Sequence, residues 1–231
     1  MSAHVYNRGN NRMGIFTQDA DCDVFLRILA AAAECHGASV HAFVVMTTHY
    51  HLIATPNSET AMAGAMKQLG ERYTRYFNRK YGRTGTIWEG RYRAKHLLDE
   101  RQWLICLRYV EQNPVRAGMV ATPDAHYWSS YRAHGLGAVI EWLVPHELYL
   151  GLGATDEERR AAHRAICADP LPDADLDSVR NCWTTLKPNP VEDESRHERL
   201  GVVVLKSEFT PTRVGMKSER GRSELRLHSD M

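Results

Sequence analysis

Long apolar runs are missing from this sequence. No segment approaches the roughly 18 consecutive apolar residues of a membrane-spanning helix, so we expect no membrane partner. The N-terminal residues, MSAHVYNRGNNR, contain no apolar segment of the kind that a secretory signal peptide has. We therefore expect a cytoplasmic protein without a signal peptide.

Cysteine is scarce and irregularly spaced. No two of the five cysteines are separated as in CxxC, which argues against both a disulfide framework and a zinc knuckle. We expect each cysteine to be a reduced thiol that fills space in the core. The cysteines are Cys22, Cys35, Cys106, Cys167 and Cys182.

Net charge is almost absent from the chain as a whole, at +1, but the charges are unevenly distributed. Residues 67–95 contain nine Lys or Arg residues and two acids, a local excess of seven positive charges. Residues 156–194 are by contrast rich in Asp and Glu. A basic segment beside an acidic one indicates a polyanionic partner for the basic part.

Hydrophobic periodicity predicts an α+β fold. Apolar residues repeat at three- and four-residue steps in the expected helices, and β-rich runs lie between them. The predicted order is β-α-β-β-α-β-α, which corresponds to an antiparallel sheet flanked by helices. The expected strands are residues 4–8, 40–46, 49–55 and 86–97, and the expected helices are residues 17–36, 58–81 and 100–113.

The structural signals weaken beyond residue 131. Residues 156–168 have the pattern of a short helix, whereas the Pro- and Asp-rich residues 169–189 resemble a linker. The last residues of the chain are polar and charged, a composition typical of disorder. We expect a main domain at residues 1–135, a small C-terminal helical extension at residues 136–180 and a polar, poorly ordered tail at residues 181–231.

The tripeptide His49-Tyr50-His51 is the sharpest local signal. On a strand, residues two positions apart project from the same face, so both imidazoles would point together while Tyr50 points away. Two neutral imidazoles side by side are a natural metal-binding pair. Taken alone, the tripeptide fits two surface histidines on an edge strand better, because short motifs have many false matches.

Tyr109 and Asn113 form a second signal. Apolar residues define a buried stripe on the helix predicted at residues 100–113, and these two residues fall together on another face. A tyrosine that lies outside the core, beside a polar amide, is placed for a contact other than packing against apolar side chains. Taken alone, a half-buried tyrosine with its hydroxyl in solvent is the simpler explanation.

The basic segment at residues 67–95 is also rich in aromatic residues. Cations neutralise phosphates, and flat rings stack on unpaired bases. Core packing accounts for some of the aromatic residues in the helix predicted at residues 58–81. It does not explain why the basic excess continues into the following strand, so the segment favours nucleic-acid binding.

Four motifs occur along the first two thirds of the chain: NRGNNR (residues 7–12), MTTHYHLIATP (residues 46–56), WEGRYRAK (residues 88–95) and RYVEQNPVRAGMV (residues 108–120). In this order and spacing they resemble the motifs of REP-associated tyrosine transposases. These are single-tyrosine transposases of the HUH (His-hydrophobic-His) endonuclease superfamily. The resemblance covers residues 3–150, and four motifs in order are far more specific than any one of them.

The resemblance implies a ferredoxin-like or RRM-like HUH fold and a metal-dependent DNA nuclease and strand transferase. His49, His51 and Asn113 would bind Mg²⁺ or Mn²⁺, and Tyr109 would be the nucleophile that forms a covalent 5′-phosphotyrosine intermediate. The substrate would be single-stranded or hairpin DNA of REP-like palindromes. We expect no nucleotide cofactor, and either a monomer or a homodimer.

The expected DNA contacts are polar or basic side chains in or near these motifs. Arg91, Arg93 and Lys95 would hold backbone phosphates, and the loop at residues 7–12 is a candidate for reading bases. The full predicted set is Asn7, Arg8, Asn10, Arg12, Lys67, Arg75, Arg79, Arg91, Arg93, Lys95 and Arg116.

Two features depart from the family pattern, and two other functions stay open. Thr48 stands where family members usually carry Asn, which weakens ordering of the turn but removes no ligand. Residues after 181 do not match the family's C-terminal region. One alternative is a domesticated sequence-specific DNA-binding protein without catalysis, although the intact HUH and tyrosine residues count against it. The other is a metallonuclease that activates water, in which Tyr109 is structural.

Overall fold

A five-stranded antiparallel sheet forms the centre of the molecule. The structure, a computed structural model, describes residues 1–184 and 202–203. The strand order is β2-β3-β1-β4-β5, and every neighbouring pair is antiparallel. The strands are β1 (Ala3–Arg8), β2 (Ala38–Val45), β3 (His49–Pro56), β4 (Arg93–His96) and β5 (Val202–Val203).

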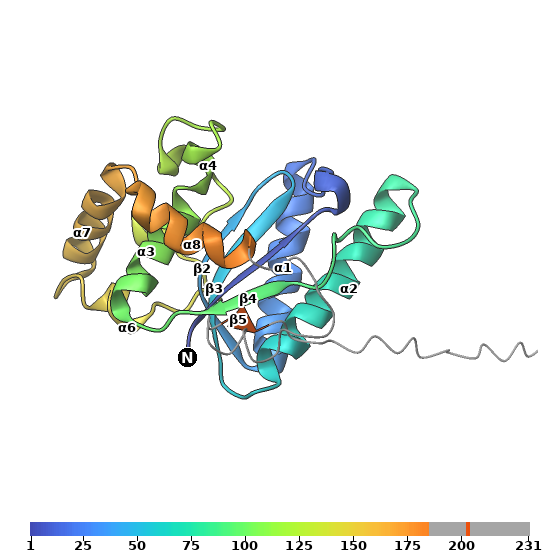
Figure 1. Ribbon diagram of the computed structural model, residues 1–231, viewed down its shortest axis with the longest axis horizontal. Coiled ribbons are helices and arrows are strands. Elements are labelled where there is room, and N and C mark those ends of the chain that lie inside the picture. The colour runs from blue at the N-terminus through green and yellow to red at the C-terminus, as the bar shows by residue number, and fades with distance from the viewer. Residues whose placement is uncertain (185–201, 204–231) are drawn as a thin grey trace, which may run out of the picture.

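Helices cover both faces of this sheet (Figure 1). α1 and α2 pack on one face, in a core that includes Phe25 and Leu52. α3 packs on the other face, in a core that includes Ile53 and Leu107. The order of elements confirms the predicted α+β class. From β1 to β4, leaving aside the short 3-10 helix η1, the elements have the ferredoxin-like βαββαβ arrangement. These helices are α1 (Asp19–His36), α2 (Ala61–Tyr81) and α3 (Glu100–Glu111).

Short helices complete the structure on the α3 side of the sheet. α8 packs against α3, and α7 lies beside α5 and α6. Among the described residues, no helix is both long enough and apolar enough to cross a bilayer. The remaining helices are η1 (Asn10–Arg12), α4 (Asn113–Arg116), η2 (Pro123–Ala125), α5 (Tyr131–His134), α6 (Glu147–Leu150), α7 (Asp156–Ala168) and α8 (Asp173–Thr184).

The region after residue 131 is more helical than its composition predicts. The helix expected at residues 156–168 is confirmed as α7, but the linker expected at residues 169–189 is wrong, because α8 occupies most of it. Asp173 lies in the first turn of α8, where a carboxylate interacts favourably with the helix dipole. Val179 is buried in the core that α3 shares, so tertiary packing stabilises this helix.

The strand expected at residues 86–97 is much shorter than predicted. Only Arg93–His96 forms a regular strand. Ile87 and Trp88 are consecutive residues buried in the same core, which a strand with alternating faces cannot achieve. Most of the predicted tail at residues 181–231 lies outside the described residues, and the predicted domain boundaries stay predictions.

The described cysteines are free thiols. Cys22, Cys106 and Cys167 are buried, as core-filling residues should be. Cys35 is exposed near the end of α1, so the expectation of a core position is wrong there. The side chain of Cys182 lies outside the described part of the structure.

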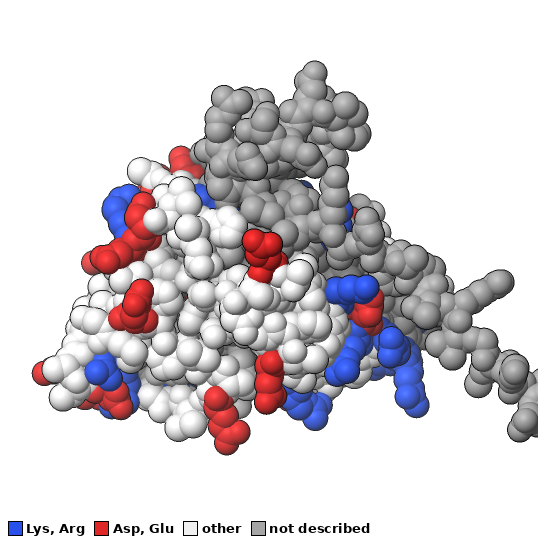
Figure 2. Space-filling view, turned by 90° about the horizontal axis from the view of Figure 1, so that it is seen from below, with Lys and Arg blue, Asp and Glu red and all other residues white. Residues whose placement is uncertain are grey.

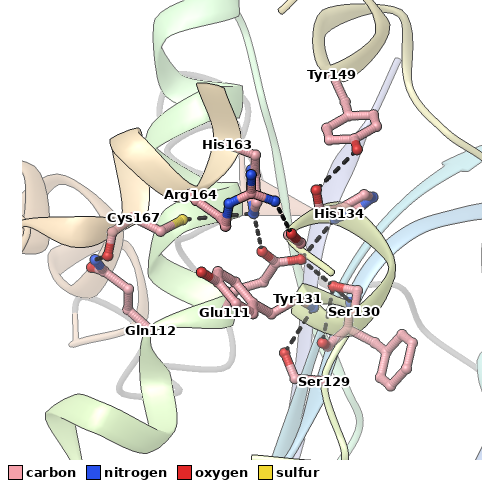
Figure 3. A network of polar contacts seen from close by, with 12 residues as sticks. Glu111, Gln112, Ser129, Ser130, Tyr131, His134, Tyr149, His163, Arg164 and Cys167 are labelled. Carbon is pink, nitrogen blue, oxygen red and sulfur yellow. Dashed lines mark hydrogen bonds and ion pairs between the residues drawn. The ribbon is translucent and has the colours of Figure 1, made fainter. Parts of the chain in front are cut away.

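A buried carboxylate at the end of α3 joins this helix to the C-terminal helices (Figure 3). Glu111 is fully buried, and its oxygens lie 2.7 Å from His134 Nδ1 and 2.6 Å from His163 Nε2. Ser130 Oγ donates a third hydrogen bond at 2.5 Å. Burial alone would raise the pKa of Glu111, but the two histidines hold it well below its usual range. The ionised carboxylate therefore fixes α3 to α5 and α7.

A second buried carboxylate holds α1 against the C-terminal end of α2. The Asp21 side chain has no solvent exposure, and Lys80 Nζ lies 2.6 Å from it. Tyr76 and Tyr81 donate hydrogen bonds to it at 2.9 and 2.7 Å. Burial would raise the pKa of Asp21, but these donors outweigh that effect and hold it well below its usual range. Asp21 is therefore a charged link between two helices of one layer.

Asp21→Ala should lower the free energy of unfolding by about 3 kcal/mol, because it leaves buried donors without their acceptor. Urea denaturation followed by circular dichroism measures this change. Asp23→Ala is the matched control, since Asp23 lies in the same helix and is exposed. It should change stability by less than about 0.5 kcal/mol. Equal losses in the two variants would contradict the role of Asp21.

Candidate active site

Polar side chains from three neighbouring strands share the face of the sheet that α3 covers. Strand β3 alternates, so Tyr50 packs in the core under α1 and α2, while Ile53 packs under α3. His49 and His51 are on the same side as Ile53, as their spacing predicts. The antiparallel register brings further side chains to this face, namely Arg8 opposite His49, Tyr6 opposite His51, Arg93 opposite Tyr6, and Lys95 opposite His4.

Each of the two predicted metal-binding histidines uses its Nδ1 atom in a hydrogen bond. His51 Nδ1 lies 2.9 Å from His4 Nε2, and His49 Nδ1 lies 3.0 Å from Thr48 Oγ1. Their ring centroids are 5.2 Å apart. Within the described part of the chain, no recorded hydrogen bond uses Nε2 of either ring. The pair therefore presents two Nε2 atoms as possible metal ligands.

Both histidines are held in the neutral form. Burial is the main cause that lowers the pKa of His49 to about 4, and the charges of Arg8 and Arg116 add to it. Burial also lowers the pKa of His51 well below its usual value, with smaller contributions from neighbouring histidines. Because metal ions bind the neutral imidazole, these environments favour coordination at neutral pH.

His4 is a member of this cluster that sequence reasoning did not select. It is almost fully buried, and its ring stacks on His51 with the centroids 5.0 Å apart. A signal was present, because His4, Tyr6 and Arg8 alternate along β1 and therefore share one face. That signal could be interpreted only once the strand pairing with β3 was known.

Tyr109 lies directly against the histidines. Its ring meets His51 edge-on at a centroid distance of 5.5 Å, and it meets His4 at 5.8 Å. The guanidinium carbon of Arg116 lies 4.0 Å from the Tyr109 ring centroid, and Arg116 donates a hydrogen bond to the Tyr109 carbonyl. The expectation of a tyrosine held off the core is wrong, because Tyr109 is only 7% exposed. The turn of α4 covers it with Arg116.

Asn113 is buried one helical turn beyond Tyr109, but not on the same helix. α3 ends at Glu111, and Asn113 begins α4, so the predicted single helix is broken. Asn113 Nδ2 is buried without a hydrogen-bond partner among the described residues, which is uncommon for a polar atom. In that part of the chain, no recorded hydrogen bond joins Asn113 to His49 or His51. The structure therefore places Asn113 one turn beyond Tyr109 with an unpartnered Nδ2 atom, and its role as a metal ligand stays a prediction.

These residues suit a divalent ion. Two imidazole nitrogens and one amide oxygen, completed by water or phosphate oxygens, are a ligand set that a divalent metal ion can accept. The two Nε2 atoms, with each Nδ1 already used in a hydrogen bond, are the observations that support this fit. His49, His51 and Asn113 would hold the ion.

A second group of possible metal ligands surrounds Glu111, at the end of α3. Ligand atoms of Glu111, His134 and His163 are within 4.8 Å of one another (Figure 3). Sequence reasoning missed this group, since its residues come from three separate helices. Glu111 is two positions after Tyr109, so its side chain leaves the opposite side of the helix. The imidazole nitrogens here are already bonded to the carboxylate, unlike the Nε2 atoms of the first cluster.

Six of the nine predicted DNA-contacting cations fall into two groups. Arg93 and Lys95 are half-buried in β4, on the same face as the histidines, and Arg91 is exposed just before them. Lys67, Arg75 and Arg79 are exposed on α2, beyond the opposite face of the sheet. Figure 2 shows Lys and Arg side chains gathered on the right of that view, which is the side of α2 in Figure 1.

The loop predicted to read bases begins next to His49. Arg8 is opposite His49 in the sheet and forms an ion pair with Glu89. Gly9 is required here, because a Cβ atom at this position would collide with the backbone oxygen of Met13. Arg12 has a left-handed backbone, an unusual conformation for a residue with a side chain.

The exposed residues of this loop are Asn10, Asn11 and Arg12. The loop is anchored by backbone hydrogen bonds to Thr48 and Ile87. Asn7 donates a hydrogen bond to the Gly90 carbonyl. A fixed backbone with exposed amide side chains next to the histidine pair is compatible with the predicted role, which stays a prediction.

One family of known proteins matches the part of the chain that contains this site. The family model described as "Transposase IS200 like" matches residues 1–113, a stretch that includes both histidines, Tyr109 and Asn113. No curated protein matches the chain.

Two solved structures are similar at low identity. One is a REP-associated tyrosine transposase bound to a REP hairpin, with 16% identity, a TM-score of 0.46, and coverage of 63% of this chain and 85% of that chain. The other is a candidate transposase from Deinococcus radiodurans R1, with 18% identity, a TM-score of 0.37, and coverage of 48% and 89%. Both TM-scores are below 0.5, so the fold assignment rests on the strand order and register described above.

Titration of the protein with Mn²⁺ should show binding that His51→Ala abolishes, because the variant removes one of the two Nε2 ligands. Isothermal titration calorimetry without DNA measures the affinity. His163→Ala is the matched control, since it removes a buried histidine of the Glu111 group. Loss of binding in His163→Ala, with His51→Ala unaffected, would assign the ion to the other cluster.

Proposed function

We propose, from the match of residues 1–113 to the IS200-like transposase family, that the chain cuts and rejoins single-stranded or hairpin DNA. Tyr109 would be the nucleophile, and a divalent ion at His49, His51 and Asn113 would assist it. The contact between the Tyr109 ring and His51 carries this proposal. Two segments far apart in the sequence meet there, each bringing the residue type that the chemistry requires.

The reaction is a transfer of a phosphodiester from DNA to protein. The Tyr109 hydroxyl oxygen loses its proton and attacks the phosphorus, so that an O–P bond forms to the tyrosine. The bond from phosphorus to the 3′ oxygen breaks, and that oxygen leaves as a 3′-hydroxyl after taking up a proton. The 5′-phosphotyrosine keeps the energy of the original bond. Attack by another 3′-hydroxyl then rejoins DNA without ATP.

The ion and Arg116 would have separate roles beside Tyr109. A bound divalent ion would supply a Lewis acid for a non-bridging phosphate oxygen and so stabilise charge in the transition state. Arg116 packs on the Tyr109 ring and limits its motion. An unperturbed phenol is a poor nucleophile at neutral pH, so a fixed orientation contributes to the rate.

The proposed DNA path follows the basic side chains beside the histidine face. Arg93 and Lys95 share that face with His51, and they would hold phosphates near the reacting one. The four-motif resemblance suggests REP-like hairpins as substrates, with the loop at residues 7–12 reading bases. The proposal includes a cytoplasmic location, supported by the free thiols among the described cysteines, and a monomer or homodimer.

Hairpin DNA labelled on the 3′ side of the cleavage site should give a protein adduct that survives denaturation. Tyr109→Phe removes only the hydroxyl, so it should fold and bind DNA normally and form no adduct. Gel electrophoresis detects the adduct, and peptide mapping locates it. Tyr131→Phe and Tyr127→Phe are controls that should still react. Cleavage at the wild-type rate by Tyr109→Phe would instead favour the water-activating metallonuclease. A wild-type protein that binds hairpin DNA but never cleaves it would favour the non-catalytic DNA-binding protein.

Replacing Arg91, Arg93 and Lys95 with Ala should weaken binding to many DNA sequences and flatten its salt dependence. On single strands the slope of log K against log salt should fall by about 0.7 for each phosphate that the variant no longer neutralises. Fluorescence anisotropy at several salt concentrations measures the slope. Removing the same charge from α2, at Lys67, Arg75 and Arg79, provides the comparison. An unchanged slope in the first variant would mean that β4 does not face DNA.

A further inference from the structure

We propose that His4 is a positioning residue that fixes His51 in the tautomer whose Nε2 atom can bind the divalent ion. This inference rests on the proposed function, since it concerns a ligand of the proposed metal site. It starts from one contact, the 2.9 Å distance between His4 Nε2 and His51 Nδ1. The sequence motifs do not include His4, and the family match assigns it no role.

The contact allows only two arrangements of the proton. A hydrogen bond between two neutral imidazoles needs one N–H donor and one bare nitrogen as acceptor. In the first arrangement, His51 Nδ1–H donates to His4 Nε2. In the second, His4 Nε2–H donates to His51 Nδ1. Both rings are buried, and a buried imidazolium beside a second imidazole is costly, so the two neutral arrangements are the ones that matter.

Only the first arrangement leaves a ligand for the metal. When His51 carries its proton on Nδ1, its Nε2 lone pair is available for coordination. When His4 donates instead, the His51 proton remains on Nε2 and blocks that atom. The direction of one buried hydrogen bond therefore decides whether His51 can bind the ion. Such contacts to the second nitrogen of a metal-binding histidine commonly set its tautomer and orientation.

Burial and stacking hold the two rings together. His4 is 1% exposed and His51 is 4% exposed, so water does not compete for the shared bond. His4 is opposite Ile53 in the register, diagonal to His51, and the rings stack at an interplanar angle of 30°. Tyr109 contacts both rings from the side of α3.

Thr48 has the corresponding contact with the other histidine of the pair. Its hydroxyl lies 3.0 Å from His49 Nδ1 and can either donate or accept. The Thr48 hydroxyl thus adapts to either tautomer of His49. His4 adapts less readily than a hydroxyl, because it can change from acceptor to donor only by moving its proton from Nδ1 to Nε2. We therefore expect the tautomer of His51 to be restricted more strongly than that of His49.

The test compares His4→Phe with His4→Gln. Phe keeps an apolar ring against His51 but removes the acceptor, so the Mn²⁺ dissociation constant should rise about 10- to 100-fold. Gln offers a side-chain oxygen that can accept from His51 Nδ1–H, so affinity should return to within a few-fold of the wild type. Tyr6→Phe is the matched control on the same face. It keeps the ring that stacks on His51, and it should bind Mn²⁺ as the wild type does.

A second readout needs no metal. Nitrogen-15 NMR of the metal-free protein distinguishes the two histidine tautomers, and His51 should carry its proton on Nδ1 in the wild type and in His4→Gln. In His4→Phe a substantial fraction should shift to the Nε2–H form. If His4→Phe does not fold, the wild-type tautomer and the His4→Gln affinity still decide the question.

The outcomes separate this inference from the proposed function. An Nε2–H tautomer of His51 in the wild type overturns the inference. So does wild-type Mn²⁺ affinity in a folded His4→Phe. A wild type that binds no Mn²⁺ at His51, but carries the expected tautomer, contradicts the proposed metal site and leaves the orienting contact in place.

Discussion

The antiparallel register of β3 between β1 and β2 is the constraint on which the other features of the site depend. It commits Tyr50 to the core under α1 and α2, and so commits His49 and His51 to the face under α3. A slip of one residue would exchange the faces and bury the histidines in the larger core. The same register brings His4 within hydrogen-bonding distance of His51. Packing of the larger core thus determines the geometry of the polar site on the opposite face.

The other half of the site depends on α3, which is fixed from two sides. Leu107 packs against the sheet, and Glu111 binds the C-terminal helices through His134 and His163. Tyr109 lies between these anchors, so its ring is held against the histidines with little freedom. If Tyr109 is the nucleophile, as proposed, a ring held in place in this way loses less entropy when it reaches the transition state. The contacts of Glu111 with the two histidines therefore support the orientation of Tyr109 on the opposite side of α3.

Local patterns predicted much of the fold, and contacts between distant segments explain what they missed. Alternation in β3 and helical periodicity in α2 depend on neighbouring residues, so the order of elements and the orientation of the histidine pair followed from sequence. The burial of Tyr109 could not be predicted from local patterns. It requires the helix break near Asn113, which places Arg116 over the Tyr109 ring. The Glu111 group and His4 were missed for the same reason. Composition predicts a linker where α8 forms, because packing against α3, and not composition, stabilises this helix.

The proposed function requires that DNA strands are joined to Tyr109 between cutting and rejoining. The configuration at phosphorus tests this step, with a hairpin substrate that carries one chiral phosphorothioate at the cleavage site. Attack by Tyr109 and then by a 3′-hydroxyl are two in-line displacements, each of which inverts the configuration. A tyrosine intermediate therefore predicts net retention in the rejoined strand. Net inversion would require a single direct displacement and would contradict a covalent tyrosine intermediate.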